Sequence, residues 1–332
     1  MSLPMRIEEL GMRSYWHFCL FLLIAVGVWG CRDVVRYVST SEHEVETPQC
    51  DVSTKRMALL RGPSVIALAD WLVNPPQIGG QKVSVQVFDA PDRVQAALIK
   101  GEADVAMLPM ISAANLYNKG VALQLLGCPI WGTLYVVERQ PIAANTPLHL
   151  FGSGTTPDIL VRHYLKQQKL DYPLNYTLRS AQEVTEGLLA GRVDRAVLGE
   201  PFLSLVLRKD SSLHIVADLN RLSPQDSIGF AQTAIVCTPE AESYRQELYA
   251  ALRRSCAETN TNPELAIQRL EEQQLFAPGA LTAESVRRCR IDFREVTEVA
   301  SSIEAFLRLI YSYEPRALGG KLPDAGFTAP SP

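Results

Sequence analysis

Hydroxyl side chains gather where a short apolar run gives way to a helix signal. The apolar run is Leu148–Phe151, and the residues GSGTT follow it at 152–156. Thr156 suits an N-cap and Pro157 suits the first turn of a helix to about Leu170, because proline needs no N–H there. Unpaired N–H groups and the positive end of the helix dipole meet at such a point. The stretch therefore predicts a site for a small polar or anionic ligand.

A carboxylate stands inside the first turn of that expected helix. Asp158 follows Pro157 directly. A carboxylate there either competes with an anionic ligand or satisfies the helix dipole itself. Arg61, at another predicted loop, is a candidate to counter its charge.

The elements that hold this loop belong to an internal repeat with an offset of ninety positions. VQAALIKGEADVAML (94–108) aligns without a gap with VTEGLLAGRVDRAVL (184–198), so that Gly101 matches Gly191 and Asp104 matches Asp194. Each copy reads as an amphipathic helix, a glycine C-cap and a buried strand, and a strand-like run precedes each helix. Strand–helix–strand is the unit of a parallel sheet, so the repeat predicts two related α/β lobes.

Four predicted strands each end just before a proline and a helix. The prolines are Pro63, Pro109, Pro157 and Pro201. Proline at the start of a helix is good helix chemistry by itself. Four equivalent junctions in two lobes, however, favour a shared ligand cleft, since ligands of open α/β sheets collect outside the carboxyl ends of the strands.

The first thirty residues are typical of a signal peptide. Phe18–Trp29 is an unbroken apolar run, shorter than the ~20 residues of a membrane-spanning helix. Gly30-Cys31 at its end resembles the lipobox of bacterial lipoproteins, in which the cysteine is lipidated. We hypothesise that Met12 is the true start, because Glu8 and Glu9 do not suit a basic leader. Residues 31–53 are polar and predict a tether.

The rest of the chain divides into two expected lobes. Residues 54–139 and 234–332 form lobe 1, and residues 140–233 form lobe 2. The two crossovers are expected at 138–146 and 229–233, with hinges near Pro141 and Gly229. A last helix is expected over about Val296–Tyr313 with one apolar stripe, and the tail from Pro315 over lobe 1.

Composition and motifs argue against several functions. The net charge is −4 with no basic stripe, so nucleic acid is not an expected partner. The five histidines show no metal-ligand spacing, and neither a G-x-S-x-G elbow nor a Walker loop is present. We expect no metal, no cofactor and no catalytic residues. Buried free thiols are the preferred reading of the cysteines, with a Cys256–Cys289 disulfide as the alternative.

Several segments together resemble a known family. The segments are MALLRGPSVIALADWL, DVAMLPMISAANLYNKG, LFGSGTTPDIL, GEPFLSLVL and ALGGKLPDAGF. They are similar to solute-binding lipoproteins of ABC importers of the nitrate/sulfonate/taurine type, which share their fold with thiamine-pyrimidine-precursor proteins. The resemblance covers roughly Met57 to Phe327. It implies a two-lobe periplasmic-binding-protein type II fold of class α/β, with a ligand cleft that closes on binding.

The candidate ligand-binding residues lie at the four junctions and the crossovers. Trp131 is a candidate to stack on a flat ligand or to pack in the core. Glu200 either accepts from a ligand amine or serves as the dipole partner of the next helix. The full candidate set is Gly62, Pro63, Ser64, Pro109, Met110, Trp131, Ser153, Gly154, Thr155, Thr156, Glu200 and Gln232.

The expected function is capture of a small polar or anionic solute, of nitrate/sulfonate/taurine or pyrimidine type, for an ABC permease and ATPase. The chain is expected to be a monomer anchored by a lipid on Cys31 at the extracytoplasmic face of the cell membrane. The alternatives are a pyrimidine-precursor-type enzyme of the same fold and a solute sensor that is not coupled to transport.

Overall fold

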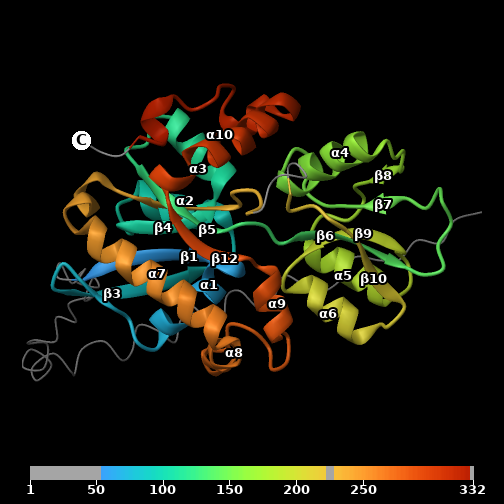
Figure 1. Ribbon diagram of the computed structural model, residues 1–332, viewed down its shortest axis with the longest axis horizontal. Helices are drawn as coiled ribbons and strands as arrows, with labels where there is room; N and C mark the ends of the chain where they lie inside the picture. Colours follow the sequence, from blue (N-terminus) through green and yellow to red (C-terminus); the bar gives the residue numbers. More distant parts are fainter. Residues whose placement is uncertain (1–53, 222–227, 330–332) are drawn as a thin grey trace, which may run out of the picture. The chain divides into compact units, whose positions relative to one another are not determined.

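The computed structural model describes residues 54–221 and 228–329. The predicted signal peptide, Cys31, the tether and Cys50 lie outside these ranges. The described residues form one compact unit. Two separate β-sheets organise it, and Figure 1 shows the second sheet with its own helices in green and yellow.

The first sheet has seven strands in a mixed arrangement. Its order is β12 (Ile291–Glu295), β5 (Gln124–Ile130), β11 (Thr233–Cys237), β4 (Val105–Pro109), β1 (Lys55–Leu60), β3 (Gln81–Phe88), β2 (Gln77–Ile78). Strands β4, β5 and β11 are buried on both faces, as their continuous apolar sequences require. Strand β1 runs parallel to β3 and β4, whereas β11 runs antiparallel to β4 and β5.

The second sheet has five strands. Its order is β10 (Leu213–Asp218), β6 (Leu134–Arg139), β9 (Arg195–Gly199), β7 (Leu148–His149), β8 (Leu174–Asn175). Strand β7 is parallel to β8 and β9, while β6 is antiparallel to β9 and β10. The five strands therefore repeat the topology of β3, β1, β4, β11 and β5 in the first sheet.

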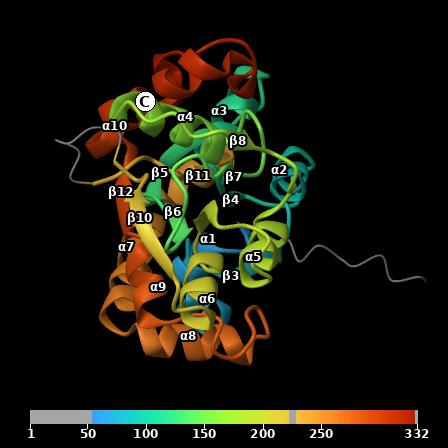
Figure 2. The same cartoon turned by 90° about the vertical axis from the view of Figure 1, so that its right-hand side faces the viewer.

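Helices cover the faces of both sheets (Figures 1 and 2). They are α1 (Pro63–Ala67), α2 (Pro91–Ile99), α3 (Met110–Asn118), α4 (Thr156–Gln168), α5 (Ala181–Leu189), α6 (Phe202–Lys209), α7 (Arg245–Thr261), α8 (Pro263–Glu272), α9 (Ala283–Arg288) and α10 (Val296–Tyr313). Short 3-10 turns are η1 (Ala69–Leu72), η2 (Pro239–Tyr244), η3 (Pro315–Leu318) and η4 (Ala325–Phe327).

The predicted repeat is present in the structure. Helix α5 and strand β9 each begin ninety residues after α2 and β4. Gly101 and Gly191 both follow their helices with φ near +70°, the left-handed conformation that glycine adopts at a helix end. The repeated aspartates each bind an arginine of a neighbouring strand: Asp104 accepts from Arg56 at 2.7 Å, and Asp194 accepts from Arg139 at 3.1 Å. The shared Asp is thus a strand-pairing residue.

The first passage between the sheets lies earlier than the sequence predicted. Strand β6 pairs with β9 and β10 in the five-stranded sheet, although residues up to 139 were assigned to lobe 1. The chain therefore crosses at residues 131–133. The apolar sequence of β6 does not reveal which sheet the strand joins, because strands of both sheets are apolar. The return passage lies between β10 and β11, a span that includes the predicted 229–233.

Two glycines allow the passages to lie against each other. Gly132 has φ +122°, and a Cβ on it would lie 2.4 Å from Oδ1 of Asn220. Gly229 has φ +114°, and its Cβ would lie 2.0 Å from the Trp131 carbonyl oxygen. Asn220 also accepts from the N–H of Leu134 at 2.8 Å. Only glycine permits this close approach of the two passages.

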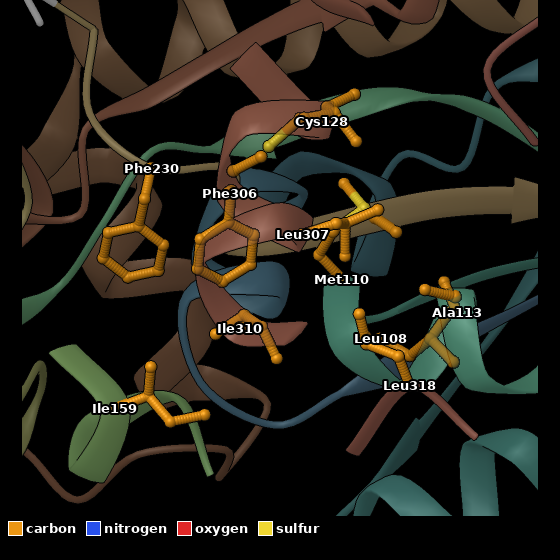
Figure 3. Close-up of a cluster of buried hydrophobic side chains, with 14 of the residues drawn as sticks. Leu108, Met110, Ala113, Cys128, Ile159, Phe230, Phe306, Leu307, Ile310 and Leu318 are labelled. Carbon is orange, nitrogen blue, oxygen red and sulfur yellow. The ribbon is translucent and has the colours of Figure 1, made fainter. Parts of the chain in front are cut away.

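One apolar cluster includes residues of both sheets' helices. Helix α10 buries the stripe of Ile303, Phe306, Leu307 and Ile310 that its sequence predicts. Figure 3 shows Phe306 and Ile310 of α10 near Phe230 and near Ile159 of α4, and the rings of Phe230 and Phe306 stack at 5.2 Å. The C-terminal tail packs on α3, where Asn118 donates to the carbonyl oxygens of Leu318 and Lys321.

The cysteines of the described chain are free and buried, as preferred from the sequence. They are Cys128, Cys237, Cys256 and Cys289. Burial raises the pKa of Cys128 and of Cys256 to about 12, which keeps these thiols protonated.

Candidate functional site

The four strand-to-helix junctions meet at one cavity of about 590 Å³. Two further junctions reach it, because Pro91 begins α2 and Ala181 begins α5. These two residues are equivalent in the ninety-residue repeat. The cavity thus lies at the carboxyl ends of strands from both sheets, where ligands of α/β sheets collect.

The lining combines apolar side chains with hydroxyls and a few other polar groups. It comprises Leu60, Arg61, Pro63, Ser64, Pro91, Pro109, Ile111, Ser112, Thr133, Leu134, Phe151, Gly152, Gly154, Thr155, Thr156, Pro157, Ala181, Gly199, Glu200, Phe202, Gln232, Thr233 and Ala317.

Two buried hydroxyls face the cavity with their hydrogen-bonding capacity unused. Ser64 is 4% exposed and Thr233 is 6% exposed. Among the residues that the structure describes, neither hydroxyl has a hydrogen-bond partner, yet both residues line the cavity. Each hydroxyl can therefore donate to, or accept from, a ligand in the cavity.

Residues of the two passages form another part of the wall. The hydroxyl of Thr133 donates to Oε1 of Gln232 at 3.0 Å. The Gln232 backbone is fixed as well, because its N–H donates to the Ile130 carbonyl oxygen and its own carbonyl oxygen accepts from the Met110 N–H. This arrangement leaves the amide NH₂ of Gln232 as a positioned donor at the cavity.

The Asp158 carboxylate accepts hydrogen bonds at the glycine-rich loop. This buried carboxylate accepts from the Gly154 N–H at 2.7 Å, from Arg162 at 2.9 and 3.0 Å, and from the Tyr176 hydroxyl at 2.7 Å. The Thr155 N–H and hydroxyl both donate to the Gly152 carbonyl oxygen. Of the two alternatives for Asp158, the structure favours satisfaction of the helix start, which takes the Gly154 N–H away from any ligand.

Glu200 is held in a similar way at the start of α6. It accepts from the Ser204 N–H at 3.2 Å, from the Ser204 hydroxyl at 2.9 Å and from Arg288 at 3.2 Å. Burial raises the pKa of Glu200 above its ordinary value, and the bonds from Ser204 and Arg288 lower it by less. Glu200 is therefore the dipole partner of α6, and it also contributes to the cavity wall.

Arg61 does not counter the charge of Asp158. Its guanidinium pairs with Asp89 and donates to the Leu275 carbonyl oxygen at 2.7 Å. Asp158 instead pairs with Arg162 on its own helix.

The structure brings most of the predicted site residues together. Those that line the cavity are Pro63, Ser64, Pro109, Gly154, Thr155, Thr156, Glu200 and Gln232. Gly62, Met110, Trp131 and Ser153 do not line it.

The excluded residues have clear positions elsewhere. Trp131 is 1% exposed, and its Nε1 donates to the Asp292 carbonyl oxygen at 2.8 Å, so its ring packs in the core and is not available for stacking. Met110 is fully buried in the cluster of Figure 3. Ser153 is exposed, and Gly62 is buried beside Pro63.

Several cavity residues were not among the candidates, although the sequence holds signals for some. The repeat predicts positions for Pro91 and Ala181, because each begins a helix that follows a strand ending at the same edge of its sheet as the junction strands. Phe202 follows directly after the Glu200-Pro201 junction. Ala317 carries no such signal, because it reaches the cavity through the packing of η3 on α3.

Residues 54–221 and 228–329 contain neither a membrane-spanning helix nor a metal-binding cluster. No helix there is long and apolar enough to span a membrane. Nor do three or more His, Cys, Asp or Glu side chains come together there in a way that could hold a metal ion.

Two α/β sheets joined by two passages, with a cavity at the carboxyl ends of both sets of strands, define a two-lobe binding protein of the periplasmic-binding-protein type II fold. Solved structures agree with this class. An ABC transporter protein from Parabacteroides distasonis is 58% identical, with 83% of this chain and 98% of that chain covered and a TM-score of 0.81.

More distant structures share the fold. The periplasmic aliphatic sulphonate binding protein SsuA from Escherichia coli is 17% identical over 84% of this chain and 92% of its own, with a TM-score of 0.65. The alkanesulfonate-binding protein SsuA from Xanthomonas axonopodis pv. citri, bound to MOPS, is 17% identical over 83% and 96%, with a TM-score of 0.57. No family model and no curated protein matches the chain.

The chain belongs to the ABC transporter proteins, and sulphonate-binding proteins share its fold. The family resemblance and the fold class predicted from the sequence are confirmed.

Proposed function

We propose that this chain captures a small organic solute in the cavity between its two sheets and passes it to an ABC permease and ATPase. The observation that carries the proposal is the convergence of six strand-to-helix junctions, three from each sheet, on one cavity. A ligand that contacts both sheets favours the closed arrangement by its differential affinity. Sulfonates, nitrate-like anions and pyrimidine-like compounds are the solute classes that the sequence suggests.

The proposal includes a place for the protein. A lipid on Cys31 holds the mature chain on the extracytoplasmic face of the cell membrane, and residues 32–53 act as the tether. The lipobox-like end of the apolar N-terminal run supports this part. Replacement of Cys31 by Ser should release the chain from the membrane fraction. Mass spectrometry of the mature N-terminus should find the lipid on the unaltered chain, and an unmodified Cys31 would contradict the anchor.

Capture and closure are tested together. A thermal-shift screen of sulfonates, nitrate, pyrimidines and neutral aromatic compounds identifies solutes that stabilise the chain. Small-angle X-ray scattering should then show a smaller radius of gyration with such a solute than without it. The same solute should stimulate the ATPase of the partner transporter. A bound solute that changes neither the radius of gyration nor the ATPase rate would contradict the transport role and leave a sensor as the alternative.

A further inference from the structure

The cavity is large and its walls are mainly apolar. Its volume of about 590 Å³ falls in the range of sites for drug-sized organic molecules. Leu60, Ile111, Leu134, Phe151 and Phe202 are among its lining residues. Such walls favour a ligand with an apolar body, since burial of apolar surface is the main source of affinity.

The charges on the wall are already paired. Among the described residues that line the cavity, the charged side chains are Arg61 and Glu200. Arg61 pairs with Asp89, and Glu200 pairs with Arg288 at 3.2 Å; neither partner lines the cavity. Each charged side chain of the wall thus already has an ion-pair partner outside it. A charged group buried there would lose its hydration without a matching counter-charge.

The helix start most suited to an anion is occupied by the protein itself. The Gly154 N–H donates to the carboxylate of Asp158, and the Thr155 N–H donates to the Gly152 carbonyl oxygen. The negative charge of Asp158, 1% exposed, lies within the first turn of α4 and offsets its positive dipole end. An anion at this loop would meet a carboxylate that already binds the Gly154 N–H.

The polar groups that remain are uncharged. They include the hydroxyls of Ser64, Ser112, Thr156 and Thr233, and the NH₂ of Gln232, whose Oε1 already accepts from Thr133. Hydroxyls both donate and accept, so they suit carbonyl, amide or ring-nitrogen groups.

We infer, on the basis of the proposed function, that the cavity takes an uncharged organic solute with a mainly apolar body and a few hydrogen-bonding groups. The fold is shared with sulphonate-binding proteins at 17% identity, a likeness that does not extend to ligand class. Ser64 and Thr233 are the residues that orient the solute's polar groups.

The test uses three probes with one ring system and three charges. They are naphthalene-2-sulfonamide, which is neutral at pH 7, naphthalene-2-sulfonate and 2-naphthylmethylammonium. Titration calorimetry with the full chain measures each affinity, and the variant Ser112→Trp, which fills the cavity from α3, gives the background. Thermal unfolding checks that this variant is folded, and Ala317→Trp replaces it if it is not.

We expect the sulfonamide to bind at least about tenfold more tightly than either charged probe, which corresponds to ~1.4 kcal/mol. Its Kd should change less than about twofold between ~0.05 and ~0.5 M NaCl, because salt screens only charge interactions. Ser64→Ala and Thr233→Val should each weaken its binding about fivefold through one lost hydrogen bond. All of this binding should be lost in Ser112→Trp.

Three outcomes would overturn the inference. In the first, the sulfonate binds most tightly of the three probes. In the second, the ammonium compound does. In the third, none of the probes shows binding that is lost in Ser112→Trp. The first two leave the proposed function intact, since a charged solute can also drive closure and transport. The proposed function is tested separately, by the scattering and ATPase measurements described above.

Discussion

At the residue scale, two buried carboxylates shape the cavity without belonging to a catalytic pair. Asp158 and Glu200 each lie near the start of a helix, and each accepts from a backbone N–H of that region and from an arginine. Both therefore neutralise a helix dipole that would otherwise attract an anion. An acidic side chain at each of these two helix starts, each paired with an arginine, explains why this part of the wall is electrically balanced.

Replacement of Asp158 by Asn should destabilise the fold by roughly 2–4 kcal/mol. The carboxylate accepts from Gly154, Arg162 and Tyr176, and the amide NH₂ of Asn would face one of these donors. Urea unfolding at pH 7 measures the loss. Glu183→Gln is the matched control, because Glu183 accepts from the Arg179 N–H at an exposed helix start, where a change below about 1 kcal/mol is expected. Equal losses in both variants would contradict the role of Asp158.

The stability contributed by Glu200 should depend on pH. Its folded pKa lies above the ordinary value of 4.5, so the folded chain keeps this proton to a higher pH than the unfolded chain. The contribution is then fully present below pH 4.5 and is lost as the pH rises through the raised folded pKa. Glu200→Gln cannot titrate. We therefore expect the unfolding free energy of the unaltered chain to fall, relative to Glu200→Gln, between pH 4.5 and 7. Urea unfolding at both pH values checks this, and a constant or rising difference would contradict it.

Sequence reasoning located the loops of the site but not the directions of their side chains. Ser64 and Thr156, from two of the junctions, and Gln232, from the second crossover, line the cavity. Trp131 does not, because the hydrogen bond from its Nε1 to Asp292 depends on β12, which is 160 residues away and was not predicted. The partners of Arg61 are likewise remote, since Leu275 is 214 residues away. Contacts of this kind follow from tertiary packing, and local patterns do not contain them.

At the element scale, the repeat was the most informative part of the sequence. Its helix and strand positions recur in the structure at the same offset, because Gly101 and Gly191 end their helices and the following strands are buried in both copies. Strands β10 and β12 were missed. Both lie at sheet edges, where β10 exposes His214, Ile215 and Val216 and its pattern does not alternate. The first passage was misplaced because β6 is as apolar as the strands of the other sheet.

Gly229→Ala should lower the unfolding free energy far more than the same substitution at a glycine that has no neighbouring atoms where its Cβ would lie. A Cβ at Gly229 would lie 2.0 Å from the Trp131 carbonyl oxygen, so one passage must move away from the other. Gly80, with φ +74° and no atom within 4 Å of a Cβ, reports the backbone strain alone. We expect a loss of about 1 kcal/mol for Gly80→Ala and roughly 3 kcal/mol or more for Gly229→Ala, from urea unfolding. Similar losses would show that the passages are not tightly apposed.

At the scale of the whole molecule, several kinds of contact among the described residues connect the two sheets. The passages meet at Gly132 and Gly229, α4 packs against α10, and ion pairs link residues near α9 to the second sheet. The α4–α10 contact includes the edge-to-face rings of His163 and Tyr313, with centroids 6.2 Å apart. A closing motion must preserve the passages, whereas it can break and remake the more exposed Arg290–Asp218 pair at little cost. This pair is therefore where the balance between open and closed arrangements can be changed without unfolding.

The Arg290–Asp218 pair provides the test of this balance. Arg290 precedes β12 of the first sheet, and its guanidinium donates to the carboxylate of Asp218, at the end of β10 in the second sheet. Exposed pairs contribute about 0–1 kcal/mol, so Arg290→Gln should hardly change the unfolding free energy. If the pair forms only in the closed arrangement, that same energy is lost from closure, and the apparent solute affinity should fall by up to about fivefold.

Arg294→Gln is the matched control, because Arg294 pairs with Asp292 inside the same strand β12 and does not link the sheets. Calorimetric titration of both variants with a solute from the thermal-shift screen gives the two affinities, and urea unfolding gives the two stabilities. We expect only Arg290→Gln to weaken solute binding, with scattering showing a larger radius of gyration at a subsaturating solute concentration. Equal affinities in the two variants would mean that the pair is present in both arrangements, and closure would then have to be controlled at the passages.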